Sequence, residues 1–125
     1  MQDSSAAPRV YDILAKVFTR EGVTECFALL GDANMNWATR LNEQGCRLTY
    51  VRHEHCAVAA AMAYARKTHS IGVASVTCGP GVTQLMTSLP AAVRAHLPLV
   101  IFAGEAPLKS GWYNQAIDQA PMVNA

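Results

Sequence analysis

The segment Ile71 to Gly81, with the sequence IGVASVTCGPG, decides the fold class of this chain. Its first seven residues are small, apolar or β-branched, which is typical of a buried strand, and the Gly-Pro-Gly sequence then predicts a tight turn. Residues from Val82 to about His96 are predicted to form a helix, and Leu97 to Ala103 (LPLVIFA) reads as a second buried strand. A strand, a helix and another continuous apolar strand indicate a β-α-β unit of a parallel sheet.

The same alternation extends toward the N-terminus. Apolar residues recur at helical spacing after Pro8 until Gly22, which predicts a helix there. The further predictions are strands at Thr24 to Leu30 and Arg47 to Arg52, and helices from about Asn34 to Asn42 and from Glu54 to about Thr68. The element order therefore predicts a doubly wound, three-layer α/β/α fold with a parallel sheet of at least four strands.

The domain organisation is read from the two ends of the chain. Met1 to Ala7 is polar and small and predicts a flexible tail, so residues 8–125 form the expected domain. After Gly104 the periodic pattern fades and no full helix is predicted, which suggests that the domain is incomplete at its C-terminus. We then expect an exposed apolar edge near Val100 to Phe102, and hence a dimer or larger species.

Composition excludes several classes of protein. With 51% hydrophobic and 15% charged residues, the chain is not expected to be disordered. A net charge of +1 gives no long-range electrostatic attraction to nucleic acid or anionic membranes. Its apolar runs are too short to span a bilayer. The four cysteines have no zinc-binding or redox spacing; they are Cys26, Cys46, Cys56 and Cys78. Because no signal peptide is evident either, we expect reduced thiols and a cytoplasmic protein.

Ligands of doubly wound folds bind beyond the carboxyl ends of the strands, which directs attention to residues 31–34, 53–55 and 78–81. The Gly79-Pro80-Gly81 turn lacks the last glycine of a GxGxxG fingerprint, because Gln84 stands there. Pro80 also removes a backbone donor, so a tight turn is favoured over a phosphate site. Glu54 opens an apolar helix, and its position alone allows either a helix-start carboxylate or a catalytic one.

The sequence His53-Glu54-His55-Cys56 invites a metal-site interpretation. The HExxH motif fails because position 57 is alanine, and the zinc deaminase pattern is absent. In a strand His53 and His55 would face one side, whereas in the first turn of a helix they would diverge. We predict no metal site, and no spacing supports a nucleophile pair such as Cys56 with His96.

Four segments taken together resemble one family. They are Phe27 to Leu41 (FALLGDANMNWATRL), Tyr50 to Arg66 (YVRHEHCAVAAAMAYAR), Gly72 to Pro107 and Gln115 to Val123 (QAIDQAPMV). Their order and spacing resemble the N-terminal, aminopyrimidine-binding domain of thiamine-diphosphate enzymes of the acetolactate synthase and 2-keto-acid decarboxylase group. The resemblance covers nearly all of the chain after residue 8.

The resemblance implies a role for particular residues. Glu54 matches the glutamate that hydrogen-bonds the aminopyrimidine ring and so activates the cofactor. The positions that match cofactor-binding residues are Gly31, Glu54, Gly79, Pro80 and Gly81. Gln115 matches a glutamine on the substrate side. Gly31-Asp32-Ala33-Asn34 is closer to the decarboxylases and His53-Glu54 to acetolactate synthase, so the reaction subtype stays open.

The resemblance also implies partners. In this family Mg²⁺ and the cofactor diphosphate are held by a second domain, through a GDG motif followed by Asn-Asn, and this chain has no such motif. The site lies between domains of different subunits, so a homo-oligomer, a 2-keto acid substrate and no activity of the chain alone are expected. FAD is possible in the parent enzyme. The alternatives are a small subunit of a naturally split decarboxylase, or a non-catalytic interaction module that retains the fold.

Overall fold

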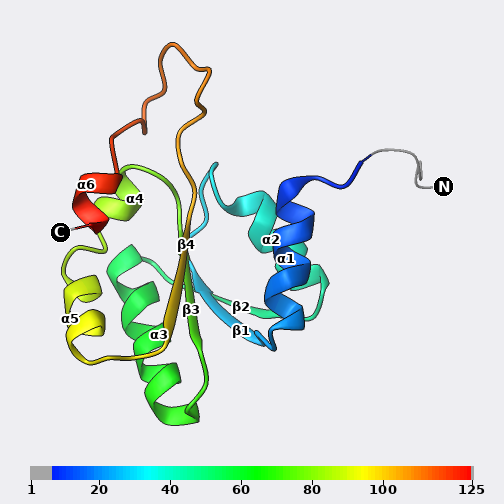
Figure 1. The fold of residues 1–125 in the computed structure, drawn as a ribbon, viewed down its shortest axis with the longest axis vertical. Helices are drawn as coiled ribbons and strands as arrows, with labels where there is room; N and C mark the ends of the chain where they lie inside the picture. Colours follow the sequence, from blue (N-terminus) through cyan, green and yellow to red (C-terminus); the bar gives the residue numbers. More distant parts are fainter. Residues whose placement is uncertain (1–6, 125) are drawn as a thin grey trace.

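The computed structural model describes residues 7–124 and has three layers, with a sheet between two groups of helices (Figure 1). The strands are β1 (Glu25–Ala28), β2 (Arg47–Tyr50), β3 (Gly72–Val76) and β4 (Leu99–Ala103). All neighbouring strands pair in parallel, in the order β2-β1-β3-β4. The predicted doubly wound α/β/α fold with at least four parallel strands is therefore confirmed.

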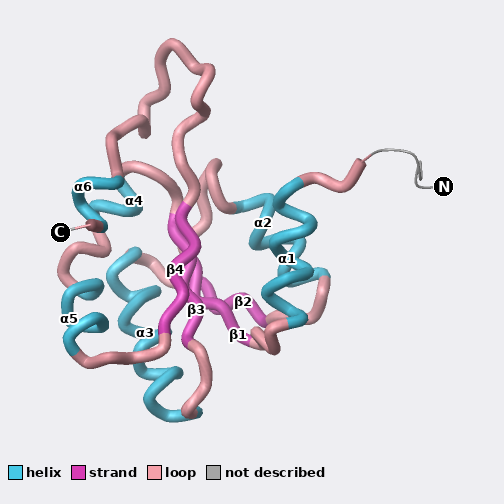
Figure 2. The backbone as a smooth tube through the Cα atoms, in the orientation of Figure 1, coloured by secondary structure: helices cyan, strands magenta, loops and turns pink. Residues whose placement is uncertain are grey.

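The helices divide between the two faces of the sheet (Figure 2). One face carries α1 (Val10–Arg20) and α2 (Met35–Glu43). The other carries α3 (Glu54–Thr68), α4 (Pro80–Thr83), α5 (Ser88–Arg94) and the single turn α6 (Ala120–Val123). Such coverage explains why β3 is buried along its whole length and why its residues are small or apolar.

Each face of the sheet has its own core. On the α1–α2 face Trp37 is buried and stacks on Phe102 of β4, with 4.0 Å between ring centroids. On the other face the alanines of α3 let the helix backbone approach the sheet closely. A Cβ atom added to Gly72 would lie only 2.2 Å from the carbonyl oxygen of Ala61, so glycine is required at this contact.

The predicted helix from Val82 to His96 is wrong, because the structure divides this stretch into α4 and α5 with a turn over residues 84–87. Pro90 gives the physical reason. In a continuous helix its ring would meet the carbonyl group four residues earlier, and its missing N–H would leave one helical bond unmade. In α5 the same proline occupies the first turn, where neither cost arises.

The other predictions hold to within a few residues at the element ends. The predicted tail over residues 1–7 lies, except for Ala7, outside the described residues. At the C-terminal side β4 forms one edge of the sheet, with Val100 39% exposed and Phe102 partly buried. The connection from β4 to α6 extends beyond the carboxyl ends of the strands (Figure 2).

Candidate functional site

The loop after β1 is held by a buried amide. Asn34 is 1% exposed, and its Oδ1 accepts a hydrogen bond of 2.8 Å from the backbone N–H of Gly31. Its Nδ2 donates to the carbonyl oxygen of Leu29 at 3.1 Å and to Ser75 Oγ at 2.9 Å. Ser75 in turn donates to the carbonyl oxygen of Phe102. One side chain thus links this loop to β3 and, through Ser75, to β4.

Two of the predicted site glycines close around Thr77, at the end of β3. A Cβ atom on Gly31 would lie 2.6 Å from Thr77 Cβ, and one on Gly81 would lie 3.0 Å from Thr77 Cγ2. Thr77 is itself buried. A larger residue at position 31 would therefore force Thr77 to shift. These glycines are explained by close packing rather than by backbone freedom, since neither has a positive φ.

Glu54 is the first residue of α3 and is half-buried. His53 caps the helix, because its Nδ1 accepts a hydrogen bond from the backbone N–H of His55 at 3.1 Å. A Cβ atom added to Gly81 would lie 3.7 Å from Glu54 Oε1, so the carboxylate faces the Gly-Pro-Gly turn. Within residues 7–124 no hydrogen bond ties the carboxylate to another side chain, which leaves its oxygens available to a ligand.

The Gly79-Pro80-Gly81 segment is a tight strand-to-helix turn, as interpreted from the sequence. Gly79 has φ 61° and ψ −111°, and Pro80 opens α4. A Cβ atom on Gly79 would lie 2.0 Å from the carbonyl oxygen of Gln115. The N–H of Gly79 donates to Gln119 Oε1 at 2.7 Å. With that donor occupied and no N–H on Pro80, the turn is poorly suited to hold phosphate.

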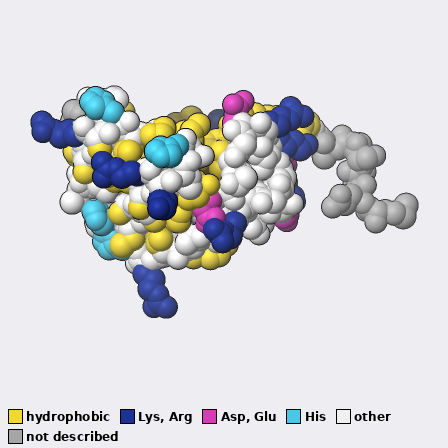
Figure 3. Space-filling view, turned by 90° about the horizontal axis from the view of Figure 1, so that it is seen from below, with side chains coloured by type: hydrophobic (Ala, Val, Ile, Leu, Met, Phe, Trp, Pro, Cys, Tyr) yellow, Lys and Arg dark blue, Asp and Glu magenta, His cyan; other side chains and the backbone are white. Residues whose placement is uncertain are grey.

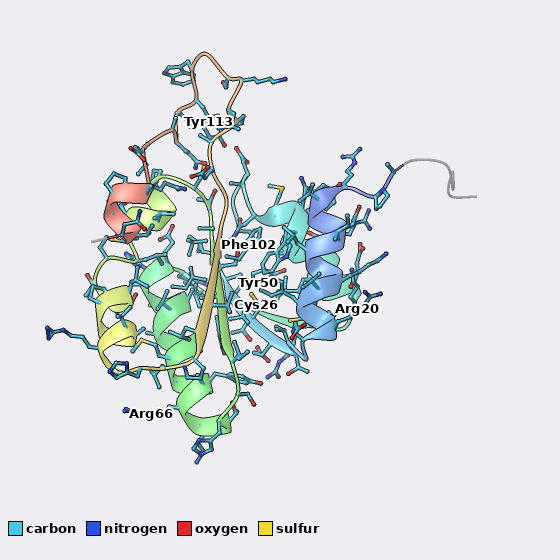
Figure 4. All side chains as sticks on the ribbon, viewed as in Figure 1. Arg20, Cys26, Tyr50, Arg66, Phe102 and Tyr113 are labelled. Carbon is cyan, nitrogen blue, oxygen red and sulfur yellow. The ribbon has the colours of Figure 1, made fainter. Side chains whose placement is uncertain are left out.

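Gln115 reaches the same edge of the sheet from the loop between β4 and α6. Its Oε1 lies 3.5 Å from Cys78 Sγ and 3.3 Å from the hydroxyl of Tyr113, which is also 3.4 Å from Asp32 Oδ2. Figure 4 shows Tyr113 above the carboxyl end of β4. Partial burial, followed by the neighbouring Asp32 carboxylate, raises the pKa of Tyr113.

The histidines on either side of Glu54 lie at the start of α3, His53 as its cap and His55 in its first turn. The ring centroids of His53 and His55 are 6.4 Å apart, and both border an open depression of about 470 Å³ with Cys56 and residues of α4 and the turn after it. His96 borders a different depression. Within the described part of the chain no three His, Cys, Asp or Glu residues are grouped so as to hold a metal ion.

The structure thus places the predicted site residues along one edge. Gly31 and Gly81 pack against Thr77, Glu54 lies next to Gly81, and Gly79 packs against Gln115. Thr77, Asn34 and Gln119 were not predicted as site residues. Asn34 carried a local signal, since it lies three residues after a glycine in a strand-ending loop. Gln119 carried none, because its partner lies 40 residues away along the chain.

Comparison with known proteins decides the family. Residues 8–122 match the family model described as the thiamine pyrophosphate enzyme, N-terminal TPP binding domain. The chain belongs to this family. In the thiamine pyrophosphate (TPP) enzymes this domain is a part of a longer protein, which agrees with the relatives found here.

Those relatives have two kinds of name. The chain is 39% identical over 110 residues to 2-hydroxyacyl-CoA lyase 2 of Caenorhabditis elegans, an alignment that covers 86% of this chain and 17% of the lyase. It is 35% identical over 113 residues to an acetolactate synthase large subunit of Mycobacterium tuberculosis, covering 89% and 21%. Acetolactate synthase 2, chloroplastic, of Nicotiana tabacum is 39% identical over 97 residues, covering 77% and 15%. The chain spans about a fifth or less of the length of these relatives.

The donor set at this edge fits the aminopyrimidine part of TPP. A carboxyl group can accept from the amino group of such a ring or, when protonated, donate to a ring nitrogen, and a wall without protruding side chains lets a flat ring approach. Glu54 supplies the first, and Gly81 opposite it supplies the second, since a Cβ there would reach toward Glu54 Oε1. For the diphosphate the chain lacks the GDG and Asn-Asn sequence.

Proposed function

We propose that the chain is the aminopyrimidine-binding half of a TPP-dependent carboligase or decarboxylase that acts on 2-keto acids in the manner of acetolactate synthase. The observation that carries the proposal is the position of Glu54, half-buried at the start of α3 and facing the Gly79-Pro80-Gly81 turn. The relatives named acetolactate synthase support the choice of reaction.

Each residue has a distinct role in this proposal. When bound, TPP supplies the reactive carbon and the electron sink for bond cleavage beside a carbonyl group. Glu54 holds a proton or a hydrogen bond at the aminopyrimidine ring through its carboxyl group. Gly31, Gly79, Pro80 and Gly81 shape the wall against the ring, and Gln115 extends toward the substrate.

The remainder of the site would come from elsewhere. Because the chain lacks the GDG and Asn-Asn sequence, the diphosphate and Mg²⁺ would be held by another domain, in a second subunit of a homo-oligomer. The isolated chain would then be inactive, and FAD, if used, would bind outside it.

A cytoplasmic location is part of the proposal. All four cysteines are free thiols, as expected in a reducing compartment. Within residues 7–124 no helix combines the length and the apolar character needed to cross a membrane. Basic side chains on the face shown in Figure 3 are separated from one another rather than gathered for an anionic partner.

A second candidate reaction is the cleavage of a 2-hydroxyacyl-CoA. The relatives named 2-hydroxyacyl-CoA lyase 2, from Caenorhabditis elegans and Homo sapiens, are 39% and 36% identical to the chain. These identities are similar to those of the acetolactate synthases, which are 35% and 39%. Glu54 serves either reaction, because both proposals use the same cofactor. A small subunit of a split decarboxylase and a non-catalytic interaction module remain the alternatives for the chain itself.

Thiamine provides a probe of the aminopyrimidine half, because it lacks the diphosphate. We expect thiamine to shift the amide NMR signals of Glu54 and Gly81 in the 125-residue chain, and Glu54→Gln to weaken this binding roughly tenfold, as for the loss of one charged hydrogen bond. Glu21→Gln, at an exposed position, is the matched control. Equal thiamine affinity of the Glu54 variant and the wild type would contradict the proposal.

A second assay separates the candidate reactions. The chain alone should form neither acetolactate nor acetaldehyde from pyruvate, and product formation by the pure chain would overturn the half-site proposal. With the full-length protein, turnover of pyruvate supports the carboligase or decarboxylase, whereas turnover of a 2-hydroxyacyl-CoA and not of pyruvate supports the lyase.

A further inference from the structure

One buried amide joins two turns at the candidate site. Gln119 is 9% exposed, and its Oε1 accepts the hydrogen bond from the backbone N–H of Gly79 at 2.7 Å. Its Nε2 donates to the carbonyl oxygen of Gly104 at 3.0 Å. Both ends of the amide are therefore used, and only one orientation of it satisfies both partners, since a flipped amide would place two donors against each other.

Both partners of this amide lie at points where the backbone is closely confined. Gly79 has a positive φ and lies against the backbone of Gln115. A Cβ atom on Gly104 would lie 2.5 Å from the carbonyl oxygen of Ala33, in the loop after β1. Gln119 thus fastens the turn after β3 to the end of β4, which is itself packed against the loop after β1.

No local group replaces this bond. The residue after Gly79 is Pro80, which has no N–H, and the N–H of Gly81 bonds within the turn to the carbonyl oxygen of Cys78. Without the glutamine oxygen, the buried N–H of Gly79 would be left unpaired, and the turn would have to open to reach water. Gly81 would move with it, and Gly81 is the residue that faces the Glu54 carboxylate.

We propose that Gln119 is a positioning residue, which holds the Gly79-Pro80-Gly81 turn in place beside Glu54 so that the turn and the carboxyl group can contact the aminopyrimidine ring together. The consequence for the ring rests on the proposed function. The clamp itself rests only on the two hydrogen bonds and on the burial of the amide.

The test uses the different hydrogen-bonding capacity of glutamine and glutamic acid. In Gln119→Glu the ionised carboxylate has no proton to donate to the Gly104 carbonyl oxygen, and repulsion between the two oxygens, at a separation that is 3.0 Å in the wild type, should move the side chain away from Gly79 as well. The neutral acid can bond to both partners. In Gln119→Leu both bonds are lost. Gln84→Glu, at an exposed position at the end of α4, is the control for added charge.

The first readout is the hydrogen-exchange protection factor of the Gly79 amide, measured by NMR on the 125-residue chain. We expect Gln119→Leu to lower it roughly tenfold or more, as for one buried hydrogen bond. Gln119→Glu should resemble the leucine variant at neutral pH and recover toward wild type below about pH 4, where an ordinary glutamate is protonated. The Gln84→Glu control should show neither change.

The second readout is thiamine affinity, which in Gln119→Glu should fall and recover over the same pH range. Unchanged Gly79 protection in both variants, or an equal loss at Ala74 within β3, would overturn the proposal, because the second result indicates global destabilisation. Unaltered thiamine binding by the variants would also overturn it. If wild-type chain bound no thiamine while Gly79 protection still followed the pH pattern, the proposed function would fail and the clamp would stand.

Discussion

Replacing Asn34 by alanine should be the most destabilising change among the polar residues that shape the candidate site. The side chain is almost completely buried and makes hydrogen bonds to the N–H of Gly31, the carbonyl oxygen of Leu29 and the hydroxyl of Ser75. Alanine removes all of them. The N–H of Gly31 then loses the acceptor that closes the loop after β1.

The magnitude follows from those bonds. A buried hydrogen bond contributes a net free energy of about 1 kcal/mol, so losing the bonds to Gly31, Leu29 and Ser75 should lower the free energy of unfolding by about 3 kcal/mol. For a domain of this size the midpoint of thermal unfolding should then fall by about 10 °C. Such a loss is a large part of the stability of an ordinary small domain, which is roughly 5–15 kcal/mol.

Urea unfolding followed by circular dichroism measures the change in the free energy of unfolding. Asn42→Ala is the matched control, because Asn42 is exposed and makes one hydrogen bond, of 2.9 Å, to the carbonyl oxygen of Cys46. The control should lose roughly 1 kcal/mol or less. A loss for Asn34→Ala no larger than that of the control would refute the assignment of Asn34 as the residue that fixes the loop.

Three further changes test the described contacts. Gly79→Ala places a Cβ at a positive φ and 2.0 Å from a backbone oxygen, so urea unfolding should show a free energy of unfolding lower by about 2 kcal/mol or more. The control Gly111→Ala, whose Cβ would meet nothing within 4 Å, should stay near wild type. Equal free energies of unfolding for the two variants would contradict this prediction. Arg47→Met leaves the buried carboxylate of Glu25 without its 2.5 Å ion pair and should lower the free energy of unfolding by roughly 1–3 kcal/mol in the same assay. An unchanged free energy of unfolding would mean that the ion pair is dispensable. Burial, with the neighbouring Cys46 thiol and Glu25 carboxylate, raises the pKa of Cys26 from 9.0 to about 12. The folded state thus favours the protonated thiol, and the stability that this preference contributes is complete below about pH 9. The free energy of unfolding should then fall by roughly 1.4 kcal/mol per pH unit as pH rises toward 12. Cys26→Ala should flatten this slope in alkaline urea titrations, and an unchanged slope would contradict the prediction.

Much of the fold was readable from local patterns. The Ala-rich stretch from Glu54 to Thr68 forms a helix with the bounds predicted, and the apolar runs form four parallel strands. Side-chain periodicity and strand burial depend on neighbours in sequence, which explains this success. The same reasoning overlooked Pro90, so the stretch after Gly81 was predicted as one helix instead of α4 and α5.

The candidate site was readable only in part. Gly31 and Gly79 lie in loops that end predicted strands, and Glu54 opens the helix that follows another strand. The parallel topology requires these strand ends to share one edge. Their resemblance to the TPP enzymes added the roles that we propose for them. The importance of Thr77 could not be predicted, because it arises from the approach of two glycines that are distant in sequence.

The sequence by itself determined the element types, the parallel sheet and the edge that holds the candidate site, because these depend on hydrophobic period and turn chemistry. The tertiary structure decided which polar atoms meet at that edge. Gln119 reaches Gly79 and Gly104 only after the chain has folded back over the strand ends, and the amide has two partners there that no local pattern records. A hydrogen bond between residues 40 positions apart depends on the position of the whole backbone, and only the packed sheet and helices fix that position.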